Sequence, residues 1–208
     1  MLIPSLVFCY VKIEMAKHSN HFNRAKTSFM KGQILLNHFL FQNLQEKEMS
    51  FEQVFERILK FMKLNPRGNY RLMIGTDSQV HHDYTLFITG IVIQNEGKGA
   101  WACIRRVYVR RRMEHLHERI SKETSLTEEI VALFTEDRKN NMIDIILPFI
   151  YQGATFSMEG HIDIGAGKRN KTRIYVEEMV ARIESLGLEP KIKPNSFVAS
   201  SYANRYTK

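Results

Sequence analysis

The fold is decided by the stretch YRLMIGT, residues 70–76, and by the two apolar segments that follow it. These segments cover residues 85–94 and 100–109, and the connection NEGKG at 95–99 joins them. Runs rich in β-branched and aromatic residues, joined by short connections that contain glycine, are typical of β-hairpins. The stretch therefore predicts three antiparallel strands that follow one another as a meander.

The rest of the chain alternates between helical and strand patterns. A helix from Phe51 to Met62, with Ser50 as its N-cap, precedes the meander. After the meander we expect the following order: a helix around 126–134 that continues or restarts through 142–150 with a bend or end at Pro148, a strand at 155–164, a helix at 172–186, a strand at 189–193 and a helix at 195–206. This order predicts an α/β fold with a mixed five-stranded sheet, in which the meander is joined by two parallel strands and flanked by helices.

Composition excludes several classes of protein. The 208 residues are 44% hydrophobic and 25% charged, which is unlike disordered, collagen-like or membrane-spanning chains. The apolar run at 6–11 is far shorter than the roughly 20 residues of a membrane span, and the two cysteines, Cys9 and Cys103, lie too far apart in sequence to indicate a disulfide framework. We therefore expect a cytoplasmic protein without membrane contact. Its net charge of +8, from 30 basic and 22 acidic residues, favours nucleic acid or another polyanion as a partner.

The domain organisation follows from where regular patterns begin. Residues 1–40 show no clean period, and Met30 offers an internal start shortly before the regular part. We interpret 1–40 as an N-terminal extension that is poorly ordered or as a misassigned start, and 41–208 as one domain.

Two aspartates occupy unusual places on the predicted strands. Asp77 follows the apolar run Leu72-Met73-Ile74, and Asp163 lies between Ile162 and Ile164. A carboxylate in a buried strand needs a partner or a metal, and Mg²⁺ prefers a few carboxylates with waters and phosphates. Two simpler interpretations stay open: Asp77 is a turn or cap residue, and Asp163 forms a salt bridge with an arginine.

Glu123 is the candidate for a third ligand. It precedes Leu126 by three residues and Ile130 by seven, which places it on the helix face that should dock on the sheet. Glu128 lies less centrally and is the fallback ligand. Alternatively, Glu123 is an ordinary first-turn acid that the helix dipole favours.

Four segments together resemble the YkuK-like group of bacterial proteins within the ribonuclease H-like superfamily. They are YRLMIGTDSQ at 70–79, KGAWA at 98–102, HIDIG at 161–165 and the ending ASSYANRYTK at 199–208. The resemblance spans roughly residues 41–208. It implies a ribonuclease H-like fold, whose strand and helix order is the one derived above.

The resemblance also implies an acidic cluster for two divalent cations, Mg²⁺ or Mn²⁺. Asp77, Glu123 and Asp163 fall on three of its positions and would be both catalytic residues and metal ligands. Asn204 falls where the fourth acid is expected, and because an amide brings no charge, binding of the second ion is in question.

Basic residues supply a candidate surface for substrate. Lys168, Arg169, Lys171 and Arg173 follow Asp163 in a loop that leads into a helix, where cations and amides can meet phosphates. The leading hypothesis is a metal-dependent nuclease that hydrolyses phosphodiester bonds in RNA, DNA or a hybrid. The alternative is a nucleic-acid-binding module whose ribonuclease H-like site is degenerate and non-catalytic.

Overall fold

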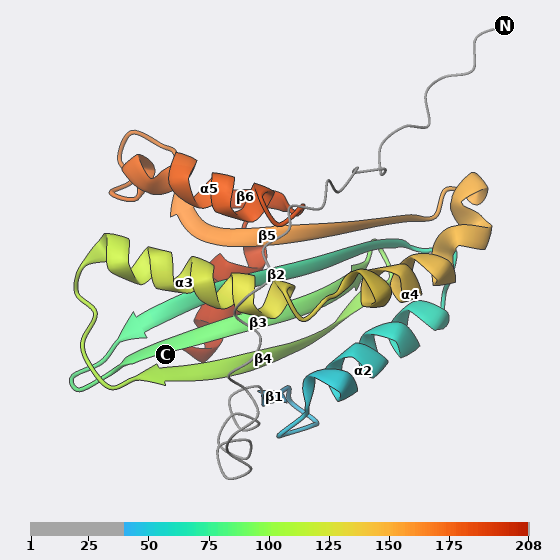
Figure 1. Ribbon diagram of the computed structural model, residues 1–208, viewed down its shortest axis with the longest axis horizontal. Coiled ribbons are helices and arrows are strands. Elements are labelled where there is room, and N and C mark those ends of the chain that lie inside the picture. The colour runs from blue at the N-terminus through green and yellow to red at the C-terminus, as the bar shows by residue number, and fades with distance from the viewer. Residues whose placement is uncertain (1–39, 208) are drawn as a thin grey trace, which may run out of the picture. The chain divides into compact units, whose positions relative to one another are not determined.

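The computed structural model describes residues 40–207, which form a mixed sheet with helices on both faces (Figure 1). Its strands are β1 (Phe41–Gln42), β2 (Asn69–Val80), β3 (Thr85–Asn95), β4 (Gly99–Val109), β5 (Thr155–Gly165) and β6 (Glu189–Lys193). Its longer helices are α2 (Phe51–Lys63), α3 (Leu116–Val131), α4 (Glu136–Ile146) and α5 (Val176–Glu184). Short 3-10 or π segments are η2 (Leu147–Gln152), η3 (Arg173–Tyr175), η4 (Val198–Ala203) and η5 (Asn204–Tyr206).

The sheet confirms the predicted meander. Its strands lie in the order β1-β4-β3-β2-β5-β6, with β2, β3 and β4 antiparallel and with β2, β5 and β6 parallel. The structure has six strands where five were expected, because β1 pairs antiparallel with β4 at Phe41 and Arg105. A strand of two residues is too short to show any alternation, so the sequence pattern could not reveal it.

The helix that precedes the meander begins where the sequence predicts. The Ser50 side chain accepts a hydrogen bond from the amide of Gln53, and the Gln53 side chain accepts one from the amide of Ser50. This reciprocal capping satisfies two amides that the first turn would otherwise leave without partners. The apolar side chains of α2 then pack into the main core, among them Val54, Ile58 and Met62.

Later helices differ from the predicted bounds mainly at their ends. Helix α3 starts at Leu116, well before the apolar residues that revealed it, because its first two turns are mostly polar, with only Leu116 and Ile120 as apolar side chains. The chain changes from α4 to the 3-10 turn η2 beside Pro148, as expected. The closing helix is wound as a π segment, η4, followed by the 3-10 turn η5. No helix within residues 40–207 has the length and apolar character to cross a membrane.

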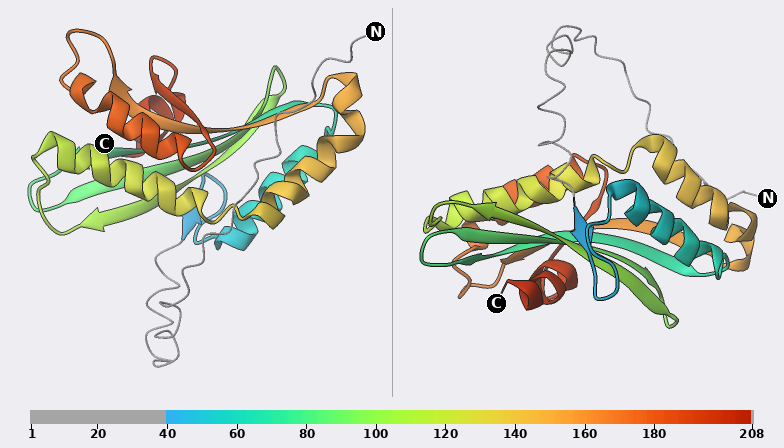
Figure 2. Two further views of the ribbon diagram at one scale, coloured as in Figure 1. Left: turned by 45° about the horizontal axis from the view of Figure 1, so that its top comes forward. Right: turned by 90° about the horizontal axis from the view of Figure 1, so that it is seen from below.

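The two faces of the sheet are covered differently. Helices α2, α3, α4 and α5 share one large core with the sheet, whereas η4 and η5 pack alone on the opposite face (Figure 2). On that second face the close approach of η4 requires glycines in the strands. A Cβ on Gly90 would lie 2.9 Å from atoms of both Val198 and Tyr202. The glycines therefore let the closing helix rest directly on the sheet.

Candidate metal centre

The two predicted aspartates lie where strands β2 and β5 part. The parallel ladder between these strands ends at the pair Thr76 and Ile162, and Asp77 and Asp163 are the next residues on each strand. Ligands of α/β sheets bind near the carboxyl ends of strands, at such points of divergence. The structure therefore brings both carboxyls to the point where β2 and β5 separate, and we call this point, with Asp77 and Asp163, the fork. Neither aspartate alone would indicate such a site.

Alternation along the strands shows which way the aspartates face. The hydroxyl of Thr76 hydrogen bonds to that of Thr127 on α3, and Ile162 packs in the core on the same side. Because successive side chains point to opposite faces, Asp77 and Asp163 face the side that carries η4. Asp77 lies within β2, so its interpretation as a turn or cap residue is wrong.

Glu123 comes to the fork from the other side of the sheet. It lies in the middle of α3 with 6% of its surface exposed, so the alternative of a first-turn acid is wrong. The hydroxyl of Ser78 donates a hydrogen bond of 2.5 Å to Oε1 of Glu123, and Nε of Arg119 lies 4.0 Å from the same oxygen. The fallback ligand, Glu128, forms a two-pronged ion pair with Arg182 instead.

The electrostatics of the fork show that the three carboxyls interact. Burial raises the pKa of Asp77 to about 6, and the charge of Asp163 adds to the rise. Burial raises the pKa of Glu123 to about 8, with contributions from Asp77 and Asp163 that the hydrogen bond from Ser78 opposes. Crowded, partly desolvated carboxyls favour their protonated forms unless a cation compensates their charge.

The donor set fits a divalent cation in kind. All three side chains offer hard oxygen ligands, and Oδ1 of Asp163 is buried without a hydrogen-bond partner. The other oxygen of Asp163, Oδ2, lies 3.0 Å from Nζ of Lys193. Within residues 40–207 no three His, Cys, Asp or Glu side chains are gathered closely enough to form a ready metal site. Lys193 and Ser78 therefore supply the partners that a cation would otherwise provide for Asp163 and Glu123.

The open alternative that Asp163 forms a salt bridge is confirmed, but its partner is Lys193 and not an arginine. Sequence reasoning missed both Lys193 and Ser78. Lys193 ends strand β6, which is parallel to β5, so its place beside Asp163 depends on strand pairing. Ser78 directly follows the candidate ligand Asp77, and this position was the one feature of the sequence that could have identified Ser78 as part of the site.

Asn204 is engaged within the closing helix. Its Nδ2 donates to the carbonyl oxygen of Ser200 at 3.3 Å, and the hydroxyl of Thr207 lies 3.5 Å from its Oδ1. The hydrogen bonds found in the described part of the chain do not connect Asn204 with the three carboxyls. Its role as a metal ligand stays a prediction.

His161 has a structural place next to the fork. Its Nδ1 accepts a hydrogen bond from the amide of Val198, which fixes the other ring nitrogen, Nε2, as the donor to Glu159. Both side chains are buried, and the hydrogen bond from His161 lowers the pKa of Glu159. His161 therefore ties β5 to the start of η4 on the face where the aspartates lie.

The predicted basic residues remain available to a ligand. Lys168, Arg169, Lys171 and Arg173 are all exposed in the connection between β5 and α5. None of the four forms a salt bridge with another residue in the range 40–207. The connection lies at the same end of the sheet as the β2–β3 hairpin, at the left of Figure 1. These cations therefore border the end of the sheet at which Asp77 and Asp163 lie.

Comparison with known proteins agrees with this architecture. The family model described as ribonuclease H-like matches residues 53–208. A protein of Bacillus subtilis strain 168, named "Uncharacterized protein YkuK", is 46% identical over 170 residues, which cover 82% of this chain and 98% of that protein. No solved structure gave a significant match. The chain therefore belongs to the ribonuclease H-like family and, within it, to the YkuK-like group.

Proposed function

We propose that this protein is a metal-dependent nuclease that hydrolyses phosphodiester bonds of nucleic acid. The observation that carries the proposal is the fork itself, where burial and neighbouring carboxylates raise the pKa values of Asp77 and Glu123 and where Oδ1 of Asp163 is buried without a hydrogen-bond partner. Burying carboxyls close together lowers the stability of a fold, so such clusters are found mainly at functional sites.

The three carboxyls would hold Mg²⁺ or Mn²⁺, with Asn204 as the predicted fourth ligand. Bound divalent ions supply charge that stabilises the attacking and leaving oxygens of a phosphodiester in hydrolysis. Asp77 and Asp163 are the ligands on the strands, and Glu123 approaches from α3 with Ser78 orienting its carboxylate. Lys193 lies beside Asp163, and about half of its side chain is exposed. Its ion pair with Asp163 can therefore open so that the carboxylate binds the metal, while the ammonium group stays near a phosphate of the substrate.

The test is hydrolysis of labelled RNA, DNA and hybrid substrates in Mg²⁺ or Mn²⁺. We expect cleavage that stops when EDTA removes the metal and that is absent from the Asp77→Asn/Asp163→Asn double variant purified in parallel. Cleavage of equal rate by the double variant would remove the fork from the mechanism, because an amide cannot replace the charge of a ligating carboxylate.

A second candidate function is a nucleic-acid-binding module without catalysis. The observation that favours it is the ion pair between Lys193 and Asp163, together with the uncharged amide at Asn204. The ion pair gives Asp163 a cationic partner without metal, and an amide in place of the fourth acid adds no charge that a metal would have to balance. Metal-independent binding with no cleavage of any of the three substrates would support this candidate against the nuclease.

Charge reversal in the basic loop is expected to weaken nucleic-acid binding. In the variant Lys168→Glu/Arg169→Glu two cations become anions, so we expect at least about tenfold weaker binding. The slope of affinity against salt should fall by about 1 for each lost phosphate contact. Binding is measured by fluorescence anisotropy over a series of salt concentrations.

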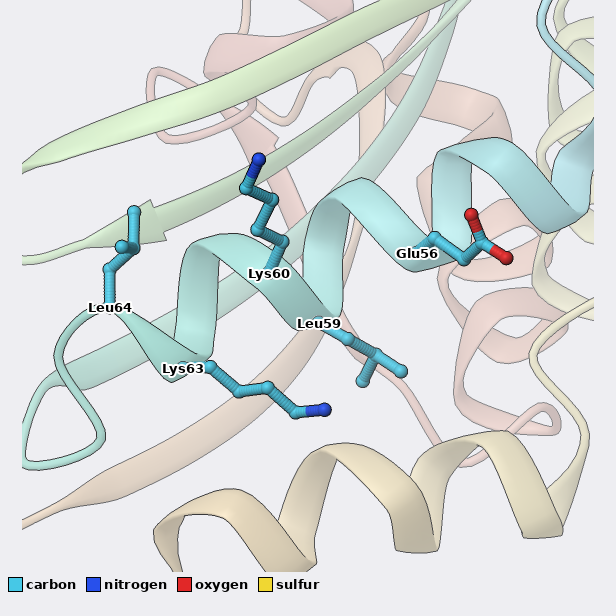
Figure 3. Close-up of a pocket in the computed structure, with 5 residues that line it drawn as sticks. All are labelled: Glu56, Leu59, Lys60, Lys63 and Leu64. Atoms are coloured by element: carbon cyan, nitrogen blue, oxygen red, sulfur yellow. The ribbon is translucent and has the colours of Figure 1, made fainter.

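The matched control is Lys60→Glu/Lys63→Glu on α2, which changes the net charge by the same amount. These lysines line an open pocket of about 400 Å³ together with Glu56, Leu59 and Leu64. The side chains of Lys60 and Lys63 point in different directions (Figure 3). Equal losses in the two double variants would show that only net charge matters and that the loop is an ordinary solvated surface.

A further inference from the structure

Three aromatic side chains form a continuous strip at the end of the meander, and we call it the aromatic strip. The rings of His81 and Tyr84 are stacked with their centroids 4.5 Å apart, and Tyr84 and Tyr108 follow at 5.6 Å. His81 and Tyr84 flank the β2–β3 turn, where the amide of His81 donates to the carbonyl oxygen of Tyr84. The strip thus joins the hairpin to the end of β4.

The aromatic strip lies on the same face of the sheet as Asp77. Asp77 pairs with Ile88, which pairs with Arg106, and residues paired across antiparallel strands point to the same face. One step along the strands on that face, Leu86 pairs with Tyr108. Two strand spacings separate Asp77 from Arg106, which is about 10 Å. The backbone of the hairpin and of the end of β4 projects past the closing helix (Figure 2), although Leu86 on this face still packs in one cluster with Ala203 and Tyr206 of that helix.

Tyr108 is exposed at the end of β4, beyond the residues that pair with β1. Its relative exposure is 59%, although it lies on the same face as the buried Leu86 and Ile88. Those two side chains pack with Ala203 and with the partly buried rings of Tyr84, Tyr202 and Tyr206. The aromatic strip therefore exposes the ring of Tyr108 to solvent, while the ring of Tyr84 is held by packing against this cluster.

The charges around the strip are cationic. Of the arginines after the middle of β4, Arg111 pairs with Glu118 and Arg112 pairs with Glu114. Arg106 and Arg110 are exposed and form no salt bridge within residues 40–207, and the guanidinium of Arg106 lies over the ring of Tyr206 at 5.9 Å. The carboxylate of Asp83, at the tip of the hairpin, is engaged by His82.

We propose that the aromatic strip is a stacking site for unpaired bases, and that the substrate is single-stranded nucleic acid running from the strip to Asp77. Aromatic rings bind the faces of bases without regard to sequence, and neighbouring arginines contact the phosphates. In a duplex the base faces are occupied by stacking on one another, so the strip selects unpaired strands. The proposal rests on the nuclease function for cleavage, but its binding step is independent of metal.

The experiment measures binding of a labelled single-stranded oligonucleotide and of its duplex to the full chain in EDTA. Tyr108→Ala should weaken single-strand binding about tenfold and leave duplex binding and the salt slope unchanged. Tyr108→Phe keeps the ring and should bind like the wild type. The matched control is Tyr151→Ala, because Tyr151 is 90% exposed on η2, away from the strip.

Equal affinities for Tyr108→Ala and Tyr151→Ala would overturn the stacking site. A wild-type dimer that becomes monomeric in Tyr108→Ala, with unchanged nucleic-acid binding, would also overturn it and assign the strip to contact between two copies of this chain. Cleavage assays on the same samples separate the two proposals. If binding depends on Tyr108 but no substrate is cleaved, the nuclease proposal is wrong and the stacking site is supported. If substrate is cleaved but binding does not depend on Tyr108, the stacking site is wrong and the nuclease proposal is supported.

Discussion

Replacing Glu123 by glutamine is expected to lower metal-dependent cleavage about a thousandfold while making the metal-free protein more stable at pH 8. The loss of cleavage follows because glutamine keeps the size of the side chain but removes the charge that holds a divalent ion. About 4 kcal/mol of lost transition-state stabilisation corresponds to a thousandfold lower rate.

The gain in stability follows from the pKa of Glu123. Burial raises this pKa from 4.5 to about 8, so the folded state binds the proton more tightly than the unfolded state. The stabilising effect of that proton is complete below about pH 4.5 and is lost as the pH rises to about 8, at about 1.4 kcal/mol for each pKa unit. Glutamine can accept the hydrogen bond from Ser78 at every pH without this loss.

The measurement is the urea midpoint of both proteins in EDTA at pH 5 and pH 8. The difference in stability between Glu123→Gln and wild type should be small at pH 5 and large at pH 8, whereas the control Glu56→Gln on the exposed face of α2 should follow the wild type. Excess Mg²⁺ should raise the wild-type midpoint at pH 8 more than that of the variant, because the ion binds the folded state. A difference that does not change with pH would mean that Glu123 is not a desolvated carboxyl.

Introducing a valine at Gly75 is expected to lower the free energy of unfolding by about 3 kcal/mol, a large part of the stability of a single domain. A Cβ at this position would lie 2.8 Å from both the Cβ and the carbonyl oxygen of His161 and 3.1 Å from the Cβ of Ala199. Because one of these atoms belongs to the backbone of β5, a change of rotamer cannot relieve the contact. Strand β2, strand β5 and helix η4 would have to move apart.

The control is Ala100→Val, which adds bulk at an exposed position of β4 in the same sheet. Urea unfolding should show little change for this control and a clear loss for Gly75→Val. Equal midpoints for the two variants would contradict the tight approach of η4 to the sheet. Since Gly75 precedes Asp77 by two residues, the same variant should also disturb the fork.

Local patterns were enough to predict most of the fold. The apolar runs and glycine-containing turns of the meander, the N-cap at Ser50 and the change of helix at Pro148 each depend on neighbours a few residues away. Features set by weak or distant signals were missed. Strand β1 is too short to show a pattern, and in the first two turns of α3 only Leu116 and Ile120 are apolar, too few to reveal the helix.

The sequence by itself predicted that Asp163 lies within a strand, that Asp77 lies at or near the end of another, and that Glu123 lies on the docking face of a helix, while a turn role for Asp77 and a first-turn role for Glu123 stayed open. Only the tertiary structure decided that β2 and β5 part at these aspartates, that Lys193 pairs with Asp163 and that Ser78 binds Glu123. The physical reason is the range of the interactions. Periodicity reports which face of an element a side chain occupies, whereas the partner of a buried charge is chosen by strand pairing and helix docking, which join residues far apart in the chain.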